Sequence, residues 1–317
     1  MLLDILSIII GIVGLVWGGN WLVTGASRLA ESFGIPRLIV GLTIVALGTS
    51  SPELLVNLSS VLNDSTDLAL GNVVGSNISN IGVILGVAGI IAPIAVHSSL
   101  IRREIPIMIG VGIGMYVLSL DGQLNQFDGI LLLLGFVIFN GLMLWVTLQN
   151  RTLAHVDDVA EFMTQEIRAI KRPIEALRLL AGLVILIIGA NLTVQGAINI
   201  ATALNVSELI IGITIVAVGT SLPELMASLI AAMRKEGELA IGNVVGSNIF
   251  NILLILGATS AIHPVNIPAS ALQFDILVMI AFSLVVFPLA WTSQKLVRWE
   301  CGALLLGYIV FVLVTIL

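Results

Sequence analysis

The sequence contains few charged residues. Asp, Glu, Lys and Arg together make up 10% of its 317 residues, whereas a soluble domain carries about 25%. Apolar residues account for 58% of the chain, and the mean hydropathy is +1.14. This composition excludes an ordinary soluble domain and predicts an integral membrane protein.

Cysteine and basic clusters are also scarce. The single cysteine, Cys301, excludes an internal disulfide framework. The net charge is −6 and no basic cluster lies in a soluble segment, so nothing favours nucleic-acid binding. The first residues, Met-Leu-Leu-Asp, lack a basic leader and a cleavage site for a secretory signal, so we expect the first apolar run to be retained.

Long apolar runs, in contrast, recur along the whole chain. A helix needs about 20 apolar residues to cross the hydrocarbon core of a bilayer. Ten runs have roughly this length, at about 3–23, 36–60, 69–92, 104–120, 128–147, 174–198, 206–231, 240–262, 272–291 and 300–317. The sequence therefore predicts an all-α integral membrane protein with ten transmembrane helices.

The basic residues all fall on one side of this topology. With the N-terminus outside, the inside loops contain all 13 of them, namely Arg28, Arg37, Arg102, Arg103, Arg151, Arg168, Lys171, Arg172, Arg178, Arg234, Lys235, Lys295 and Arg298. The positive-inside rule then predicts a multi-pass protein of the cell (inner or plasma) membrane, with both termini outside. Of the acidic residues, only Glu53 and Glu224 fall away from a predicted loop.

The chain also repeats itself. Residues 36–86 align with 207–257 without a gap, at a constant shift of 207 − 36 = 171, and about thirty of roughly fifty positions are identical. We therefore expect two five-helix repeats, 1–148 and 174–317, joined by a cytoplasmic connector at 149–173. Because five is odd, the second repeat is predicted to be inverted, as in many secondary transporters.

Each repeat carries a Gly-Thr-Ser-x-Pro-Glu motif, at 48–53 and at 219–224. Proline has no amide hydrogen, so Pro52 is expected to break its helix near Gly48 and Thr49. The polar groups Thr49, Ser50 and Glu53 then lie within one turn, and Thr220, Ser221 and Glu224 correspond to them in the second repeat. Two buried carboxylates repel each other unless a cation lies between them.

A second motif, Gly-Asn-Val-Val-Gly-Ser-Asn, occurs at 71–77 and at 242–248. Asn80 follows Ser76 by four residues, and Asn251 follows Ser247 in the same way, so each pair shares a helical face. All candidate ligands in both motifs are oxygen atoms, whereas His97, His155, His263 and Cys301 lie outside them. This donor set favours a hard cation such as calcium or sodium over zinc or copper.

Several polar and small residues have a structural alternative. The first group, Gly71, Gly75, Gly242 and Gly246, has the small-xxx-small spacing that allows helices to pack closely. The amides of Asn72, Asn77, Asn243 and Asn248 either bind ions or form hydrogen bonds between helices. Asn20 and Asn191 are expected to be structural, and the buried glutamates have the alternative of structural partners or protonation. His155, Asp157 and Asp158 give little support for a regulatory site in the connector.

The paired motifs resemble the two alpha-repeats of the sodium/calcium exchanger family, within the calcium/cation antiporter superfamily, in its compact prokaryotic form. The resemblance covers nearly the whole chain and implies ten helices, two of which slide against the rest. It implies these ion ligands: Ala46, Thr49, Ser50, Glu53, Ser76, Asn80, Ala217, Thr220, Ser221, Glu224, Ser247 and Asn251. It implies no cofactor besides the transported ions, calcium and sodium, and no obligate protein partner.

Two departures from the family pattern bear on selectivity. Ser51 stands where many relatives have leucine and adds a hydroxyl beside the expected site. Position 251 is asparagine, whereas some relatives, including potassium-dependent exchangers, have aspartate there. The expected ligand set then contains two carboxylates, Glu53 and Glu224, which balance one calcium ion and weaken the case for co-transported potassium.

We therefore expect an antiporter that exchanges sodium for calcium by alternating access and drives calcium efflux. The alternatives are a proton/calcium exchanger of the same superfamily, which two close carboxylates could support, and a cation channel. An enzyme is disfavoured, because neither Ser50 nor Ser221 has a histidine or lysine base within its motif.

Overall fold

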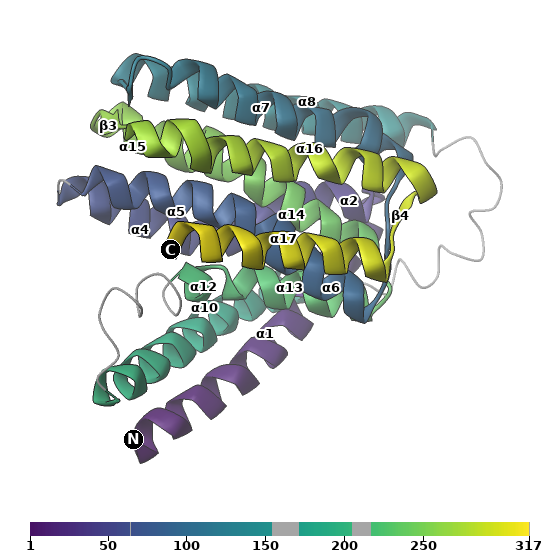
Figure 1. Cartoon of the computed structure of the whole chain (residues 1–317). Helices are drawn as coiled ribbons and strands as arrows, with labels where there is room; N and C mark the ends of the chain where they lie inside the picture. Colours follow the sequence, from purple (N-terminus) through teal and green to yellow (C-terminus); the bar gives the residue numbers. More distant parts are fainter. Residues whose placement is uncertain (64, 154–170, 205–216, 317) are drawn as a thin grey trace.

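The computed structural model describes residues 1–63, 65–153, 171–204 and 217–316. Within these ranges the protein is a bundle of helices with two very short β-ribbons (Figure 1). Seven helices are long and apolar enough to cross a membrane, and a bent pair, Arg37–Thr49 with Ser51–Leu62, adds an eighth candidate. The predicted helical membrane protein is therefore confirmed at this level.

The elements of the first half run from the N-terminus to the connector. They are α1 (Leu2–Phe33), α2 (Arg37–Val40), η1 (Gly41–Val45), α3 (Ala46–Thr49), α4 (Ser51–Leu62), α5 (Thr66–Ser79), η2 (Asn80–Leu85), α6 (Gly86–Ile91), β1 (Ile94–Ala95), η3 (Leu100–Glu104), α7 (Ile105–Leu118), β2 (Gln123–Leu124) and α8 (Gln126–Leu153). The η elements are short stretches of π-helix.

The second half repeats this order. Its described elements are α10 (Arg172–Ala203), α12 (Ala217–Thr220), α13 (Leu222–Met233), α14 (Gly237–Phe250), η6 (Asn251–Leu256), α15 (Gly257–Ile262), β3 (Val265–Asn266), η7 (Ala271–Asp275), α16 (Ile276–Ser293), β4 (Lys295–Leu296) and α17 (Arg298–Ile316). The starts of α5 and α14 differ by 237 − 66 = 171 residues, the same shift that aligns the sequences.

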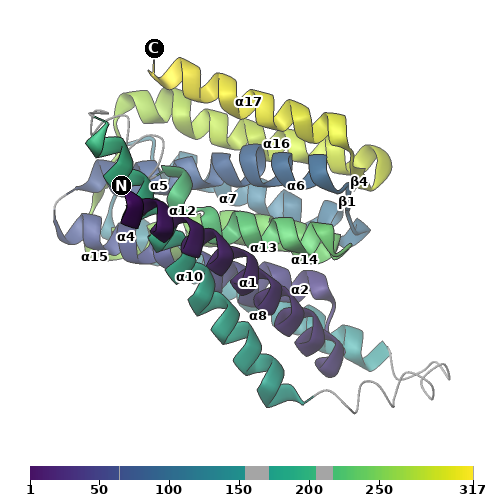
Figure 2. The same ribbon diagram turned by 90° about the horizontal axis from the view of Figure 1, so that it is seen from below.

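The longest helices, α1 and α10, pack against each other at one side of the bundle (Figure 2). Glycines every seven residues allow this contact: a Cβ built on Gly182 would lie 2.7 Å from the carbonyl oxygen of Gly18, and one on Gly25 would lie 2.8 Å from that of Glu175. Residues near the end of α1 contact residues near the start of α10, so the two helices are antiparallel.

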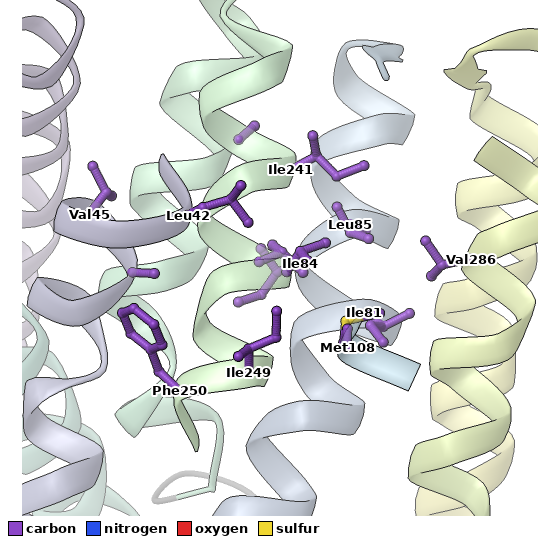
Figure 3. Close-up of a cluster of buried hydrophobic side chains, with 14 of the residues drawn as sticks. Leu42, Val45, Ile81, Ile84, Leu85, Met108, Ile241, Ile249, Phe250 and Val286 are labelled. Atoms are coloured by element: carbon purple, nitrogen blue, oxygen red, sulfur yellow. The ribbon is translucent and has the colours of Figure 1, made fainter. Parts of the chain in front are cut away.

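The centre of the bundle is formed by α14, which begins the candidate span with the largest buried share, Gly237–Ile262. Figure 3 shows its Ile241, Ile249 and Phe250 among apolar side chains of η1 and η2. The outer helices instead expose large apolar side chains, including Trp17 and Leu306. This distribution suits a protein whose outer surface contacts lipid rather than water.

Two antiparallel ribbons connect the halves reciprocally. Ile94 of β1 pairs with Leu296 of β4, and Leu124 of β2 pairs with Val265 of β3. Each ribbon therefore contains one strand from the first half and one from the second. Among the described residues, neither half forms a ribbon of its own.

The expected count of ten spans is only partly reached. The apolar run 104–120 forms α7, which has 14 residues and continues directly from η3. The run 206–231 lies partly outside the described residues, and its described part is α12 with α13. Most of the expected connector 149–173, with His155, Asp157 and Asp158, also lies outside them, although α8 reaches Leu153 and α10 begins at Arg172.

More acidic residues are buried than the sequence predicted. Besides Glu53 and Glu224, the side chains of Glu104, Glu175, Asp128 and Glu300 are buried. All four lie at the start of a helix, beside a predicted loop, so the sequence indicated their position but not their burial. Asp128 and Glu300 accept backbone N–H groups at the starts of α8 and α17, whereas Glu104 and Glu175 pair with arginines.

Candidate functional site

Each proline motif interrupts a helix just before its glutamate. Ser50 separates α3 from α4, and the helix axis bends by 43° at this point. Pro52 lies at the start of α4, where a missing N–H costs least. Glu53 therefore lies in the first turn of α4, and Glu224 lies in the first turn of α13. The positive end of each helix dipole favours a carboxylate there.

The two carboxylates are deeply buried and linked across the halves. Glu53 is 2% exposed and Glu224 is 1% exposed. Ser50 Oγ donates a hydrogen bond to Oε1 of Glu224 over 3.1 Å. Ser50 lies three residues before Glu53, so the same bond places Glu224 beside the segment that carries Glu53. The structure thus brings together the two acidic residues that the motifs singled out.

The asparagines that follow the second motif lie where an α-helix changes to a π-helix. Asn80 is the first residue of η2, and Asn251 is the first residue of η6. Such π-segments occur frequently at functional sites. α13, which carries Glu224, packs against η2, while α4, which carries Glu53, packs against η6. Each acidic helix therefore faces the amide segment of the other half.

Four asparagines form a reciprocal network between the halves. Asn77 Nδ2 donates to the backbone oxygen of Asn248 over 3.2 Å, and Asn248 Nδ2 donates to that of Asn77 over 3.2 Å. Asn251 Nδ2 donates to Oδ1 of Asn77, and Asn80 Nδ2 donates to Oδ1 of Asn248, both over 2.9 Å. Of the two alternatives for Asn77 and Asn248, the structure shows hydrogen bonds between helices.

Unpartnered buried oxygens concentrate on the motif residues. Seven buried side-chain oxygens among the described residues lack a hydrogen-bond partner, and six belong to candidate ligands: Glu53 Oε2, Asn80 Oδ1, Ser221 Oγ, Glu224 Oε2, Ser247 Oγ and Asn251 Oδ1. Buried polar atoms are normally hydrogen-bonded, because leaving one unpaired costs about 1–3 kcal/mol. The six oxygens are therefore available to a cation.

The remaining candidates are placed as follows. Thr49 is fully buried, and its Oγ1 lies 3.2 Å from Oδ1 of Asn243. Ser76 is buried, and Ala46 lies against Gly246. Thr220 is half-buried and takes part in an interaction. Ala217 is the first residue of α12. Ser51 Oγ donates to the carbonyl oxygen of Leu47 over 2.8 Å, so this hydroxyl is bound to its own helix.

The glycines of the second motif differ between the halves. A Cβ on Gly242 would lie 2.8 Å from the carbonyl oxygen of Leu38, and one on Gly246 would lie 2.8 Å from Cβ of Ala46. The packing role of these two glycines is therefore observed in α14. Among the described residues, nothing lies within 4 Å of a Cβ placed on Gly71 or Gly75.

Some polar contacts around the site were not predicted. Asn57 and Ser228, at equivalent positions, accept hydrogen bonds from Asn72 over 2.6 Å and from Asn243 over 2.9 Å. Their constant shift of 171 residues was a signal in the sequence, but it did not reveal which side chains meet. Asn20, expected to be structural, accepts a bond from Arg234 over 2.6 Å.

The chain is similar to known proteins over nearly its whole length. The family model described as "Sodium/calcium exchanger protein" matches residues 3–145 and 174–317. "Putative antiporter CaxA" of Alkalimonas amylolytica is 39% identical over 94% of this chain and 93% of the relative. "Sodium/calcium exchanger MaX1" of Methanosarcina acetivorans is 30% identical over 98% of each chain. "Inner membrane protein YrbG" of Escherichia coli is 37% identical over 97% of this chain and 94% of the relative.

The fold is also found in solved structures. The sodium-calcium exchanger NCX_Mj, soaked with sodium and strontium, superposes with a TM-score of 0.84 at 32% identity, over 98% of this chain and 97% of that one. Family model, relatives and fold agree over nearly the whole length. The chain belongs to the sodium/calcium exchanger family, in its compact prokaryotic form. It is a multi-pass membrane protein of a family of cation antiporters, not of an enzyme class.

Proposed function

We propose that the protein exchanges sodium for calcium at one site in the middle of the bundle. The observation that carries the proposal is the set of six unpartnered buried oxygens, which lie on the two repeated motifs or, for Asn80 and Asn251, three residues after the second motif. Hydroxyl, amide and carboxylate oxygens are the ligands that hard cations prefer. The proposed ligand set is the full group of twelve residues that the family resemblance implies, with Glu53 and Glu224 as its two charged members.

The charge of the site supports mutually exclusive binding. Calcium neutralises Glu53 and Glu224 together, and sodium ions bound in its place use the same two carboxylates. A site without a cation leaves two repelling carboxylates in a region from which water is excluded, so crossing the membrane in that state is unfavourable. This difference between the loaded and the unloaded site enforces exchange rather than leak.

We further propose an architecture of ten spans in two inverted repeats, 1–148 and 174–317, with a cytoplasmic connector at 149–173. The repeated element bounds and the reciprocal ribbons support two equivalent halves. The distribution of all 13 basic residues supports termini outside the cell membrane. In this architecture α1 and α10, which pack mainly on each other, are the pair that moves, and sodium entry drives calcium efflux.

The test is calcium-45 uptake into proteoliposomes loaded with sodium and diluted into sodium-free buffer. The expected result is uptake that requires the outward sodium gradient and disappears in Glu53→Gln. Glu31→Gln is the matched control, because Glu31 is an exposed carboxylate paired with Arg37 at the end of α1. Near-normal uptake by Glu53→Gln would overturn the ligand assignment.

Two alternatives correspond to other outcomes of the same assay. Calcium uptake that ignores sodium but follows an imposed pH gradient indicates proton coupling, which two close carboxylates can support. Downhill calcium flux without any counter-ion indicates a channel. Sodium-dependent uptake excludes both as the main activity.

A further inference from the structure

We propose that Asn77 and Asn248 are positioning residues, which fix the side-chain amides of Asn80 and Asn251 so that both turn oxygen, not nitrogen, toward the ion site. The proposal rests on the proposed function, because it takes these two oxygens as ligands. It assigns a role to two residues that the motifs contain but the ligand set does not.

The orientation is set first by a backbone carbonyl. A carbonyl oxygen only accepts hydrogen bonds, so the side-chain atom that contacts it must be a donor. The backbone oxygen of Asn248 lies 3.2 Å from one terminal atom of Asn77, which is therefore Nδ2. Asn77 is 1% exposed, so water does not compete for this contact. The other terminal atom of the Asn77 amide is consequently its oxygen.

The orientation of the Asn77 amide in turn fixes the orientation of the Asn251 amide. Asn77 Oδ1 contacts the terminal atom of Asn251 over 2.9 Å, and an oxygen acceptor requires a donor there, so that atom is Nδ2. Oδ1 of Asn251 then occupies the opposite edge of its amide. It is buried and has no hydrogen-bond partner in the described structure. One backbone carbonyl thus determines which atom of Asn251 faces the site.

An equivalent pair of hydrogen bonds runs from the first half to the second and back, through Asn248 to Asn80. The backbone oxygen of Asn77 fixes Nδ2 of Asn248 over 3.2 Å, and Oδ1 of Asn248 fixes Nδ2 of Asn80 over 2.9 Å. Oδ1 of Asn80 is likewise buried without a partner. Because equivalent residues differ by 248 − 77 = 171, one arrangement appears twice, once from each half.

Orientation matters because an amide has two unlike ends. If the amide of Asn251 turned over, its NH₂ group would point its partial positive charge at the cation. A hydrogen-bond acceptor on the side away from the ion site holds the NH₂ group there and prevents this. The ligand is then already ordered before the ion binds, so binding costs less conformational entropy. Outer groups that orient metal ligands typically change affinity 10–100-fold when they are mutated.

The experiment measures binding of Ca²⁺ alone to the purified full-length protein, by calorimetry in sodium-free buffer. Asn77→Leu is expected to raise the Kd for Ca²⁺ 10–100-fold. The matched control is Asn140→Leu, because Asn140 donates to the carbonyl oxygen of Phe136 in its own helix, over 2.9 Å, and lies outside the ligand set. Asn140→Leu is expected to stay within about threefold of the unmodified protein, inside ordinary variation among surface substitutions.

A rescue variant separates positioning from general damage. In Asn77→Leu combined with Asn251→Asp, position 251 carries a carboxylate, which presents an oxygen in either orientation. Affinity is therefore expected to return to within about threefold of Asn251→Asp alone. If the double variant stays as weak as Asn77→Leu, the loss is structural and the proposal is overturned. If Asn77→Leu is not monodisperse, Asn77→Ser replaces it, because a serine is too short to reach Asn251.

Two outcomes distinguish this inference from the proposed function. If Asn251→Ala weakens Ca²⁺ binding but Asn77→Leu does not, the ligand stands and the positioning role is wrong. If Asn251→Ala binds Ca²⁺ as the unmodified protein does, Asn251 is not a ligand, and the ligand set of the proposed function fails together with the inference.

Discussion

Ser50 of the first half donates a hydrogen bond over 3.1 Å to Glu224 of the second half, 174 residues away in the chain. The two residues belong to equivalent motifs, so a hydroxyl of the first motif contacts a carboxylate of the second. This bond makes the candidate site a joint product of both halves.

Replacing Ser50 by alanine should weaken calcium binding about tenfold. Ser50 is one of the proposed ligands; a polar contact with a charged group contributes about 1.5 kcal/mol or more, and 1.4 kcal/mol corresponds to a factor of ten. Calorimetric titration with Ca²⁺ measures the effect. Ser51→Ala is the control, since the Ser51 hydroxyl is bound to Leu47, and it should leave the Kd unchanged. Equal losses in both variants would show that Ser50 has no special contact with the site.

Replacing Gly182 by leucine should destabilise the protein by separating α1 from α10. A Cβ at this position would already lie 2.7 Å from the carbonyl oxygen of Gly18. Overpacking of this kind costs about 1–3 kcal/mol, and a lower thermal midpoint of the detergent-solubilised protein reports it. Gly141→Leu in α8 is the control, because nothing lies within 4 Å of a Cβ there among the described residues. A midpoint equal to that of the control would argue against close packing of these two helices.

Replacing Arg234 by alanine should loosen one end of α1. Arg234 donates to Thr24 over 2.5 Å and to Asn20 over 2.6 Å, and Ser27 bonds to Glu236 of the same loop. The three α1 residues share one face, so the loop between α13 and α14 holds α1 along almost two turns.

The measurement is amide hydrogen exchange of the α1 peptides. Arg234→Ala should speed exchange around residues 20–27, by roughly the tenfold that a loss of about 1–2 kcal/mol implies. Calcium affinity should not change, because Arg234 lies outside the ligand set. Arg102→Ala, at an exposed arginine of η3, serves for comparison. Unchanged exchange in α1 would refute the idea that this loop restrains the helix.

Replacing Glu175 by glutamine should lower the stability of the protein by removing the ion pair between Arg28 of α1 and Glu175 of α10. Glu175 is buried and binds Arg28 over 3.0 Å and Arg178 over 2.7 Å. Because both arginines are partly exposed, the expected cost is about 1–2 kcal/mol rather than the larger value of a fully buried pair. Urea or thermal unfolding in detergent measures it, with Glu31→Gln as the exposed counterpart. A loss no larger than that of the counterpart would mean that Glu175 contributes little.

The sequence predicted those features that depend on local chemistry. Pro52 indicated the interruption before Glu53, because a residue without an N–H cannot continue a helix undisturbed. The shift of 171 residues predicted that the second half would repeat the elements of the first. The identity of the two motifs also indicated which side chains to examine as ligands.

Contacts between distant segments could not be predicted in the same way. The repeat shows that Asn77 and Asn248 are equivalent, but equivalence does not imply that each contacts the other's carbonyl. That contact depends on how α5 and α14 cross, which no local pattern encodes. Glu104 was missed for a similar reason: it follows two arginines, so it resembled a loop border, whereas its side chain is fully buried.

The reciprocal ribbons can form only late in biosynthesis, because each needs a strand from the second half. Ile94 cannot meet Leu296 until 296 − 94 = 202 further residues have been made, which takes about 10–40 s at 5–20 residues per second. During that interval the first half resides in the membrane without its partner strand, and until residue 224 has been made Ser50 also has no Glu224 to bind. The first half must therefore be inserted into the membrane before its contacts with the second half can form. Until then, its polar residues lie in lipid or in the insertion machinery without those partners.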